Sequence, residues 1–178
     1  MESHPAEMAL FTFLETLGIT IKTVRHAPVF TVEQAQAARL GADGGMPGWH
    51  TKNLFVRDKK KRRALVVAEE SVKIDLRGLA DLIGLGRLSF GSADSLKDML
   101  GVEPGSVTPF GLFNARISDG EPPRLVVALD ETLVSGGVIN CHPLHNAATT
   151  TIAPDDLIKF IRACGYEPLI INLTDNAG

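Results

Sequence analysis

The order of the expected strands and helices in this 178-residue chain predicts an α+β fold with a mixed or antiparallel sheet. Strand patterns follow strand patterns and helix patterns follow helix patterns, whereas a doubly wound sheet alternates the two. Hydrophobic residues make up 44% of the chain and charged residues 22%, as in ordinary soluble globular proteins. We expect one domain over residues 1–178, because a chain of this length builds a core without disulfide staples.

The first part of the chain predicts a helix, a strand and a second helix. A stripe of apolar residues predicts the first helix over Glu7 to Leu17, and alternating residues predict a strand over Ile19 to Val24. Thr31 suits the cap of the second helix, since Gln34 takes the capping-box position and Gly41 lies just beyond the expected end.

A β-hairpin is expected next, after a loop at 42–49 that is rich in glycine. Apolar runs over Lys52–Arg57 and Ala64–Ala68 are its two strands, and the charged residues 58–63 form its tip. The rest of the chain predicts strands at 125–129, 138–141, 149–152 and 169–173 and helices at 76–83, 92–100 (capped by Ser92, stopped by Gly101) and 154–163.

The charges are unevenly distributed along the chain. The 18 Lys and Arg against 21 Asp and Glu give a net charge of −3, which argues against a protein that coats duplex nucleic acid. Residues Lys59–Arg63 alone carry +5, so the rest of the chain carries −8. This basic tip is either a solvated turn that keeps the strand pair from aggregating or a contact to a phosphate backbone.

Cysteine usage and hydropathy predict a cytoplasmic protein. Cys141 and Cys164 are too few for a disulfide framework and lack CxxC spacing, which suits a reducing compartment. The first residues lack the basic region and apolar run of a signal peptide. The longest uncharged stretch, 132–154, contains histidines, asparagines and prolines, so we expect no membrane span.

The chain lacks the P-loop, GxGxxG, HExxH and GxSxG patterns, which weakens nucleotide-binding, metalloprotease and α/β-hydrolase functions. Lys52 and Asn53 open the first hairpin strand, where a lysine can project into a cavity and bind a phosphate or a developing oxyanion. The alternative is an ordinary exposed lysine beside a loop.

Two uncharged segments are further candidates. In residues 104–115, Gly105 and Gly111 let backbone N–H groups approach a ligand as an anion-binding nest, unless the segment is only a tight connection. His142 and His145 could bind a metal, but no carboxylate is near in sequence. A single histidine that orients a ligand is a better hypothesis than a metal site, and a half-buried, hydrogen-bonded histidine is an equal alternative.

Three motifs in order give the chain a family resemblance. Residues 50–58 (HTKNLFVRD), 105–111 (GSVTPFG) and 142–146 (HPLHN) resemble the YbaK/ProX aminoacyl-tRNA deacylases, free-standing relatives of the editing insertion domain of bacterial prolyl-tRNA synthetase. Residues 26–33 are also similar to this family's early strand-to-helix segment. Within the family, the first two motifs look most like the branch that clears alanine from tRNA(Pro).

The resemblance implies a fold and a set of site residues. The fold is a central mixed, largely antiparallel, barrel-like sheet flanked by helices, with a cavity over the sheet and neither metal nor cofactor. Catalytic roles fall on Lys52, Gly105, Pro109 and His142. Substrate-binding roles fall on Phe30, Thr31, Asn53, Ser106, Val107, Thr108 and Asn146. From its charge rather than from the resemblance, the basic tip is the expected contact to the tRNA backbone, through Lys59, Lys60, Lys61, Arg62 and Arg63.

The implied activity is hydrolysis of the aminoacyl ester of mischarged tRNA(Pro), most of all Ala-tRNA(Pro). The ester is already activated, so positioning, oxyanion stabilisation and a water suffice. The expected partners are the acceptor end of the tRNA and prolyl-tRNA synthetase. Three alternatives stay open: a non-catalytic tRNA-binding module, a deacylase for another small amino acid such as cysteine, and a metal hydrolase built on Cys141, His142 and His145.

Overall fold

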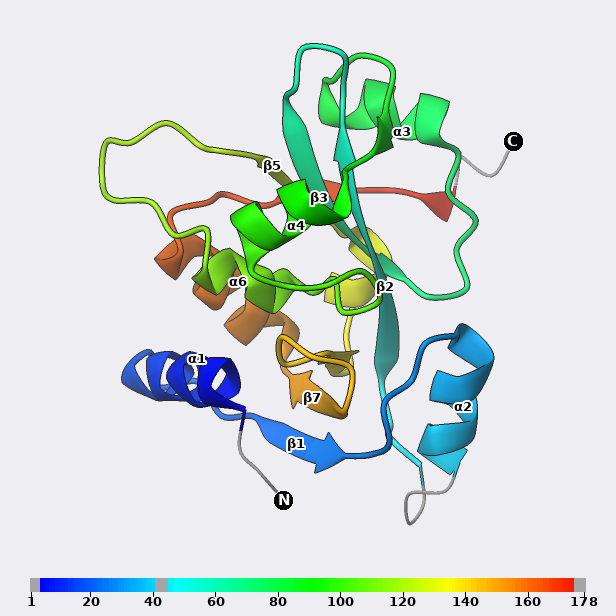
Figure 1. Ribbon diagram of the computed structural model, residues 1–178. Coiled ribbons are helices and arrows are strands. Elements are labelled where there is room, and N and C mark those ends of the chain that lie inside the picture. The colour runs from blue at the N-terminus through cyan, green and yellow to red at the C-terminus, as the bar shows by residue number, and fades with distance from the viewer. Residues whose placement is uncertain (1–3, 41–44, 175–178) are drawn as a thin grey trace.

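The computed structural model describes residues 4–40 and 45–174. Eight strands in this part of the chain form a sheet in the order β1-β7-β6-β2-β3-β5-β8, with β4 paired to β2 (Figure 1). The strands are β1 (Lys22–Arg25), β2 (Trp49–Arg57), β3 (Arg63–Glu69), β4 (Ser89–Phe90), β5 (Val126–Asp130), β6 (Ile139–Cys141), β7 (Ala148–Ile152) and β8 (Leu169–Ile171). The helices are α1 (Pro5–Thr16), α2 (Val32–Leu40), α3 (Leu76–Ile83), α4 (Ala93–Leu100), the 3-10 helix η1 (Pro109–Phe113), α5 (Glu131–Val134) and α6 (Pro154–Ala163).

The sheet is mixed, which confirms the predicted α+β class. The pairs β1–β7, β6–β7, β2–β3 and β2–β4 are antiparallel, and β2–β6, β3–β5 and β5–β8 are parallel. The sheet does not close as the barrel-like expectation implied, because β1 and β8 lie at its two ends and no ladder of the described residues joins them. The long strand β2 pairs with β6 through its first residues and with β3 through the rest.

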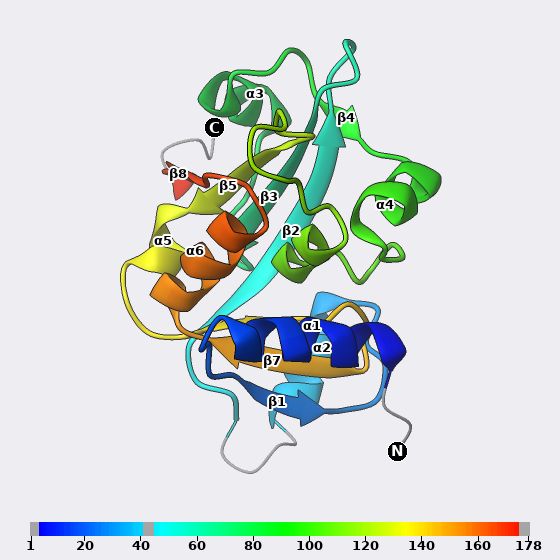
Figure 2. The same ribbon diagram turned by 90° about the vertical axis from the view of Figure 1, so that its left-hand side faces the viewer.

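Helices cover both faces of the sheet, and β3 shows why (Figure 2). Leu65 and Val67 point into a core that also contains residues of α1, α4, η1 and α6. Ala64, Val66 and Ala68 point the other way, against α3. Successive side chains of a strand face opposite sides, so an unbroken apolar run is what a strand buried on both faces requires.

Local sequence signals account for most helix ends. Ser92 accepts a hydrogen bond from the amide of Ser95 and caps α4, and Gly101 ends it in the left-handed conformation, both as predicted. Thr31 and Gln34 form the expected caps at the start of α2: the Gln34 amide donates to Thr31 Oγ1, and Gln34 Oε1 accepts from the Phe30 amide. Gly41, the predicted end of this helix, lies outside the described residues.

Other boundaries differ from the sequence pattern. Strand β1 begins at Lys22 and not at Ile19, because the Ile19 amide donates to Leu14 and closes the last turn of α1. Strand β2 begins at Trp49, inside the predicted loop. The short elements β4, η1 and α5 were not predicted. Among the described residues, no helix has the length and apolarity needed to cross a membrane.

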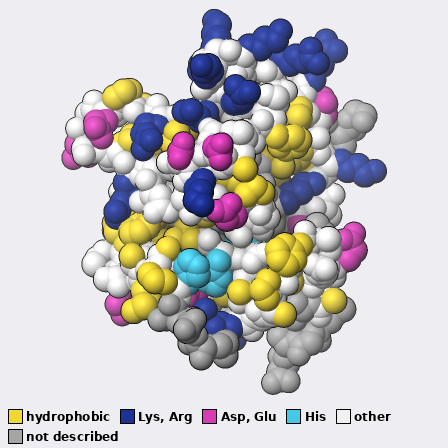
Figure 3. Space-filling view, viewed as in Figure 1, with side chains coloured by type: hydrophobic (Ala, Val, Ile, Leu, Met, Phe, Trp, Pro, Cys, Tyr) yellow, Lys and Arg dark blue, Asp and Glu magenta, His cyan; other side chains and the backbone are white. Residues whose placement is uncertain are grey.

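The predicted hairpin is present, with a buried aspartate behind its basic tip. Asp58 is 3% exposed and accepts hydrogen bonds from the amide and the guanidinium of Arg62 and from the amide of Gly86. Burial raises the pKa of Asp58, but these hydrogen bonds and the Arg62 charge outweigh it and lower the pKa overall. The lysines 59–61 stay exposed, and Figure 3 shows a concentration of dark blue basic side chains at this end of the molecule.

One edge of β2 has a gap in its pairing. Near its start, Trp49 and His50 pair with β6, and near its end Val56 and Arg57 pair with β4. Between them, residues 51–54 have no strand partner on this edge within the described chain. The loop between α4 and η1 reaches β2 there instead, as Figure 1 shows, so the gap is filled by a loop rather than by a strand.

Candidate active site

A cavity of about 260 Å³ lies at the gap in β2. Seven of the predicted site residues line it: Phe30, Thr31, Lys52, Asn53, Gly105, Val107 and His142. They come from four segments that are far apart in the sequence. The fold therefore brings together the three motifs that carry the family resemblance.

Lys52 is a partly buried residue on the wall of the cavity. Its ammonium donates to the backbone carbonyl of Val72, in the segment between β3 and α3. Its backbone is fixed by the ladder to β3, opposite Ala68. The positive charge is thus held at the cavity, where it can exchange a carbonyl for a stronger anionic acceptor.

Asn53 joins the strand to the loop and presents an unused acceptor. Its Nδ2 donates to the carbonyl of Val107 at 2.9 Å and to Thr51 Oγ1 at 3.3 Å. Its Oδ1 is buried and accepts no hydrogen bond from the described part of the protein. Buried side-chain oxygens are nearly always paired, so this unpaired acceptor is unusual.

The loop between α4 and η1, residues 101–108, approaches the cavity through a tight turn and is called the glycine loop below. The Ser106 amide donates to the carbonyl of Glu103, and Gly105 has a φ of +88°, as the third residue of a type II turn requires. Nothing lies within 4 Å of the position that a Gly105 Cβ would take, so glycine is needed here for the backbone conformation and not for space. The amides of Gly105 and Val107 make no backbone hydrogen bond within the described chain and can serve an oxyanion.

His142 is held in one orientation by the chain around it. Its Nδ1 lies 3.0 Å from the carbonyl of Ala148 and donates to it. Its own carbonyl accepts from Thr108 Oγ1 at 2.6 Å. The ring centroid lies 6.5 Å from that of His26, which is anchored by Thr149.

Four predicted residues support the cavity without lining it: Ser106, Thr108, Pro109 and Asn146. Thr108 is fully buried and ties the glycine loop to His142, while Pro109 starts η1. Asn146 donates to the carbonyl of Val29 at 2.9 Å, next to Phe30 and Thr31. Their positions favour roles in holding the loop and the entrance segment.

The five basic residues of the hairpin tip are not part of the cavity. From Lys52 to Asp58 the strand rises about 20 Å at about 3.3 Å per residue. Arg62 is bound to Asp58 at 2.7 Å, and Arg63 pairs with Arg57 in the ladder. The exposed lysines 59–61 are therefore the part of the tip that is available to a distant portion of a long ligand.

Sequence reasoning missed four lining residues: Val29, Ala35, Thr51 and Glu70. Glu70 follows β3, and its amide donates to the carbonyl of His50. A single glutamate after a strand gives no sequence signal. Only the pairing of β2 with β3 shows that it reaches the same cavity as Lys52.

The residues of the metal hypothesis do not form a metal site. No group of three His, Cys, Asp or Glu side chains in residues 4–40 and 45–174 is arranged to hold an ion. Burial raises the pKa of the Cys141 thiol. His145 pairs with the buried Glu7 at 3.2 Å, and burial lowers the pKa of His145 although Glu7 opposes this.

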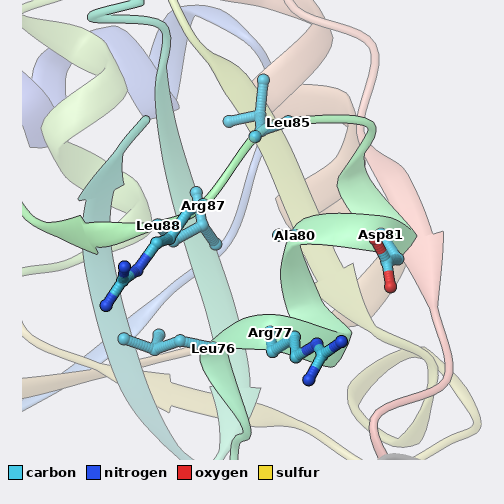
Figure 4. Close-up of a pocket in the computed structure, with 8 residues that line it drawn as sticks. Leu76, Arg77, Ala80, Asp81, Leu85, Arg87 and Leu88 are labelled. Atoms are coloured by element: carbon cyan, nitrogen blue, oxygen red, sulfur yellow. The ribbon is translucent and has the colours of Figure 1, made fainter. Parts of the chain in front are cut away.

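A larger hollow of about 670 Å³ lies elsewhere, over α3 and the segment that follows it. Figure 4 shows Leu76, Leu85 and Leu88 around it, with Arg77 and Arg87 beside them. All its lining residues fall within 76–88, a single stretch of chain. None of the predicted site residues lines it.

The fold and the smaller cavity define a class of protein: an α+β domain with a cavity lined by a lysine, an asparagine, a histidine and a glycine-containing loop. Residues 26–160 match the model of the aminoacyl-tRNA editing domain family, and the chain belongs to this family. This confirms the family resemblance carried by the three motifs and agrees with the predicted aminoacyl-tRNA deacylase class.

Relatives and solved structures cover nearly the whole chain. It is 37% identical to the prolyl-tRNA editing protein ProX of Acetoanaerobium sticklandii, over 90% of this chain and 93% of that protein. It is 34% identical to the prolyl-tRNA synthetase associated domain-containing protein 1 of Bos taurus, over 94% and 95% of the two chains. A crystal structure described as a candidate trans-editing enzyme for prolyl-tRNA synthetase has the same fold, with a TM-score of 0.68 and 21% identity over 96% of this chain and 99% of that one.

Proposed function

We propose that this protein is a trans-editing hydrolase that removes amino acids from mischarged tRNA(Pro), with alanine as its main substrate. The observation that carries the proposal is the 260 Å³ cavity, which gathers Lys52, Asn53, Gly105 and His142 from three distant segments. The names of the relatives, a prolyl-tRNA editing protein and a prolyl-tRNA synthetase associated domain protein, support tRNA(Pro) as the substrate.

In the proposed reaction, a water attacks the carbonyl carbon of the aminoacyl ester. The amides of Gly105 and Val107 stabilise the oxygen that becomes negative, and Lys52 holds the terminal phosphate. The bond from the carbonyl carbon to the ribose oxygen breaks, and the ribose oxygen takes up a proton as the amino acid leaves. The neighbouring ribose hydroxyl helps to deprotonate the water, while His142 and Asn53 orient the substrate.

In this proposal, selectivity for alanine over proline is steric. The cavity admits the small side chain and excludes the proline ring. Such exclusion can exceed the 1–3 kcal/mol or so that a pocket gains from one extra methylene. Cysteine has a small side chain too, so Cys-tRNA(Pro) is the competing substrate.

The test is loss of amino acid from alanyl-, cysteinyl- and prolyl-tRNA(Pro). We expect fast release of alanine, no release of proline, and a loss of about 100-fold or more in Lys52→Ala. Lys159→Ala, an exposed lysine on α6, is the matched control and should behave as wild type.

Other results would point to the alternatives. Tight tRNA binding without release of any amino acid would contradict the proposal and favour a binding module. Faster release of cysteine than alanine would correct the substrate. Loss of activity with a chelator would contradict the proposed reaction, which uses no metal.

A further inference from the structure

A second cavity adjoins the candidate active site. It has a volume of about 230 Å³, and Asn53, Gly105 and Val107 line both cavities. Its other walls are mainly apolar side chains of β2, β4 and α4, among them Phe55 and Phe90. Pockets for whole drug-sized ligands measure about 300–1,000 Å³. This cavity therefore suits one part of a larger molecule whose other part lies in the first cavity.

Phe90 is an exposed aromatic ring on a fixed backbone. Its side chain is 63% exposed, although its residue pairs with the buried Val56 of β2. The next amide, of Gly91, donates to the carbonyl of Phe55 at 2.9 Å. A Cβ on Gly91 would lie 2.4 Å from the Phe55 ring, so glycine allows this close approach of β4 to β2. A flat apolar ring is thus presented at the cavity without a mobile loop behind it.

The wall shared by the two cavities contains the buried acceptor Asn53 Oδ1, which has no protein donor in the described chain. A ribose hydroxyl is a donor of the right kind, and in an aminoacyl-tRNA it is bonded to the same sugar as the ester and the base. With the hydroxyl at Asn53 and the ester in the first cavity, the base of that sugar reaches the second.

The charge beyond the second cavity suits the rest of a nucleic-acid strand. After Val56, which is paired with Phe90, β2 continues to Arg57 and then to the exposed lysines 59–61. Phosphates of a strand that passes over Phe90 would therefore meet positive charge in that direction. The first cavity, the Phe90 ring and the basic tip thus lie one after another along β2.

We propose that the second cavity binds the terminal nucleobase of the tRNA acceptor end, stacked on the ring of Phe90. This rests on the proposed function, since it assumes that the ester of the same nucleoside lies in the first cavity. Stacking on an aromatic ring tolerates any base, because every base has a π-face. Phe90 is then a positioning residue that fixes the ester through the rigid nucleoside.

The test compares a tRNA(Pro) acceptor minihelix that has its terminal base with one whose last nucleotide is abasic. Binding of the uncharged minihelices and deacylation of the alanylated ones are measured for wild type, Phe90→Ala, Phe90→Trp and Met8→Ala. Met8 is 55% exposed on α1 and serves as the control. In wild type, we expect removal of the base to weaken binding and kcat/KM about 10- to 100-fold.

Phe90→Ala should bind both minihelices as weakly as wild type binds the abasic one, whereas Phe90→Trp and Met8→Ala should keep the preference for the base. Equal binding of the two minihelices by wild type, or an undiminished preference in Phe90→Ala, would overturn the proposal. The binding arm needs no hydrolysis. If wild type releases no amino acid, the proposed function fails while the nucleobase site is still decided by the two affinities.

Discussion

The hollow over α3 and the candidate active-site cavity differ in size, in origin and in chemistry. The one over α3 is the larger, about 670 Å³ against 260 Å³, and its walls come from one stretch of chain. The smaller one is built by five segments that meet at the gap in β2, and an unpaired Asn53 Oδ1 is buried beside it. Size alone would select the larger hollow, whereas convergent polar groups select the smaller one. The chemistry of the walls is the better guide.

The sharpest test of this comparison changes one residue in each hollow. Asn53→Leu removes the hydrogen bond to the Val107 carbonyl and the free acceptor, so the glycine loop shifts. We expect kcat/KM for alanyl-tRNA(Pro) to fall about 100-fold, the loss typical of a small misplacement of reacting groups. Arg87→Leu, in the larger hollow, should change kcat/KM less than twofold. A similar fall in kcat/KM in both variants would contradict the assignment of the reaction to the smaller hollow.

A second prediction tests whether activity depends on the backbone conformation at Gly105. Gly105→Ala forces alanine into a φ of +88°, which costs about 1–2 kcal/mol and reorients the loop amides. We expect a fall of about tenfold in kcat, measured by single-turnover deacylation. Gly120→Ala is the matched control, because Gly120 has a φ of +87° and also has nothing within 4 Å of its Cβ position. It should lose similar stability and no activity.

A third prediction concerns the basic tip, which borders the larger hollow through the Asp58–Gly86 hydrogen bond. Changing Lys59, Lys60 and Lys61 together to glutamine should weaken tRNA binding about tenfold while the single-turnover rate at saturation stays the same. Each phosphate contact contributes about 0.7–0.9 to the slope of log affinity against log salt, so the slope should fall by about 2. An unchanged slope would make the tip a solvated turn.

The smallest effect is expected on stability alone. The pKa of Asp58 is lowered in the folded protein, so its contribution is present above the ordinary carboxyl value of about 3.9 and is lost as pH falls through the folded-state pKa. Asp58→Asn should therefore lower the urea midpoint at pH 7, and the difference from wild type should shrink below about pH 4. Asp98→Asn, an exposed change on α4, should show no such pH dependence.

Local patterns predicted the hairpin and most helices well because their signals lie within a few residues. Ser92 and Gly101 mark the two ends of α4 through hydrogen bonds to residues three and four positions away. The two-residue strand β4 is too short for any periodic pattern, and it exists because Val56 and Arg57 offer it an edge. The predicted Ile19 start of β1 was wrong because an apolar alternation does not reveal that the amide of Ile19 closes a helix.

The sequence predicted which motifs contribute to the candidate site, but not how their residues are arranged in space. Lys52, Gly105 and His142 were expected together from the order of three motifs, and they do line one cavity. Glu70, which lines the same cavity, was not expected, because it is brought there by the pairing of β3 with β2. Sequence spacing also could not show that Thr108 is buried and holds His142 in place.

The unpaired edge of β2 creates a risk of aggregation, which is independent of the proposed reaction. Unpaired strand edges are templates on which a second chain can add a strand, and this is how ordered aggregates begin. Here the loop lies over the opening with two prolines, Pro104 and Pro109, which have no N–H to offer a ladder, and Asn53 occupies the carbonyl of Val107. Any variant that loosens this loop to admit a bulkier substrate also uncovers the edge, so broader specificity would come at the expense of solubility.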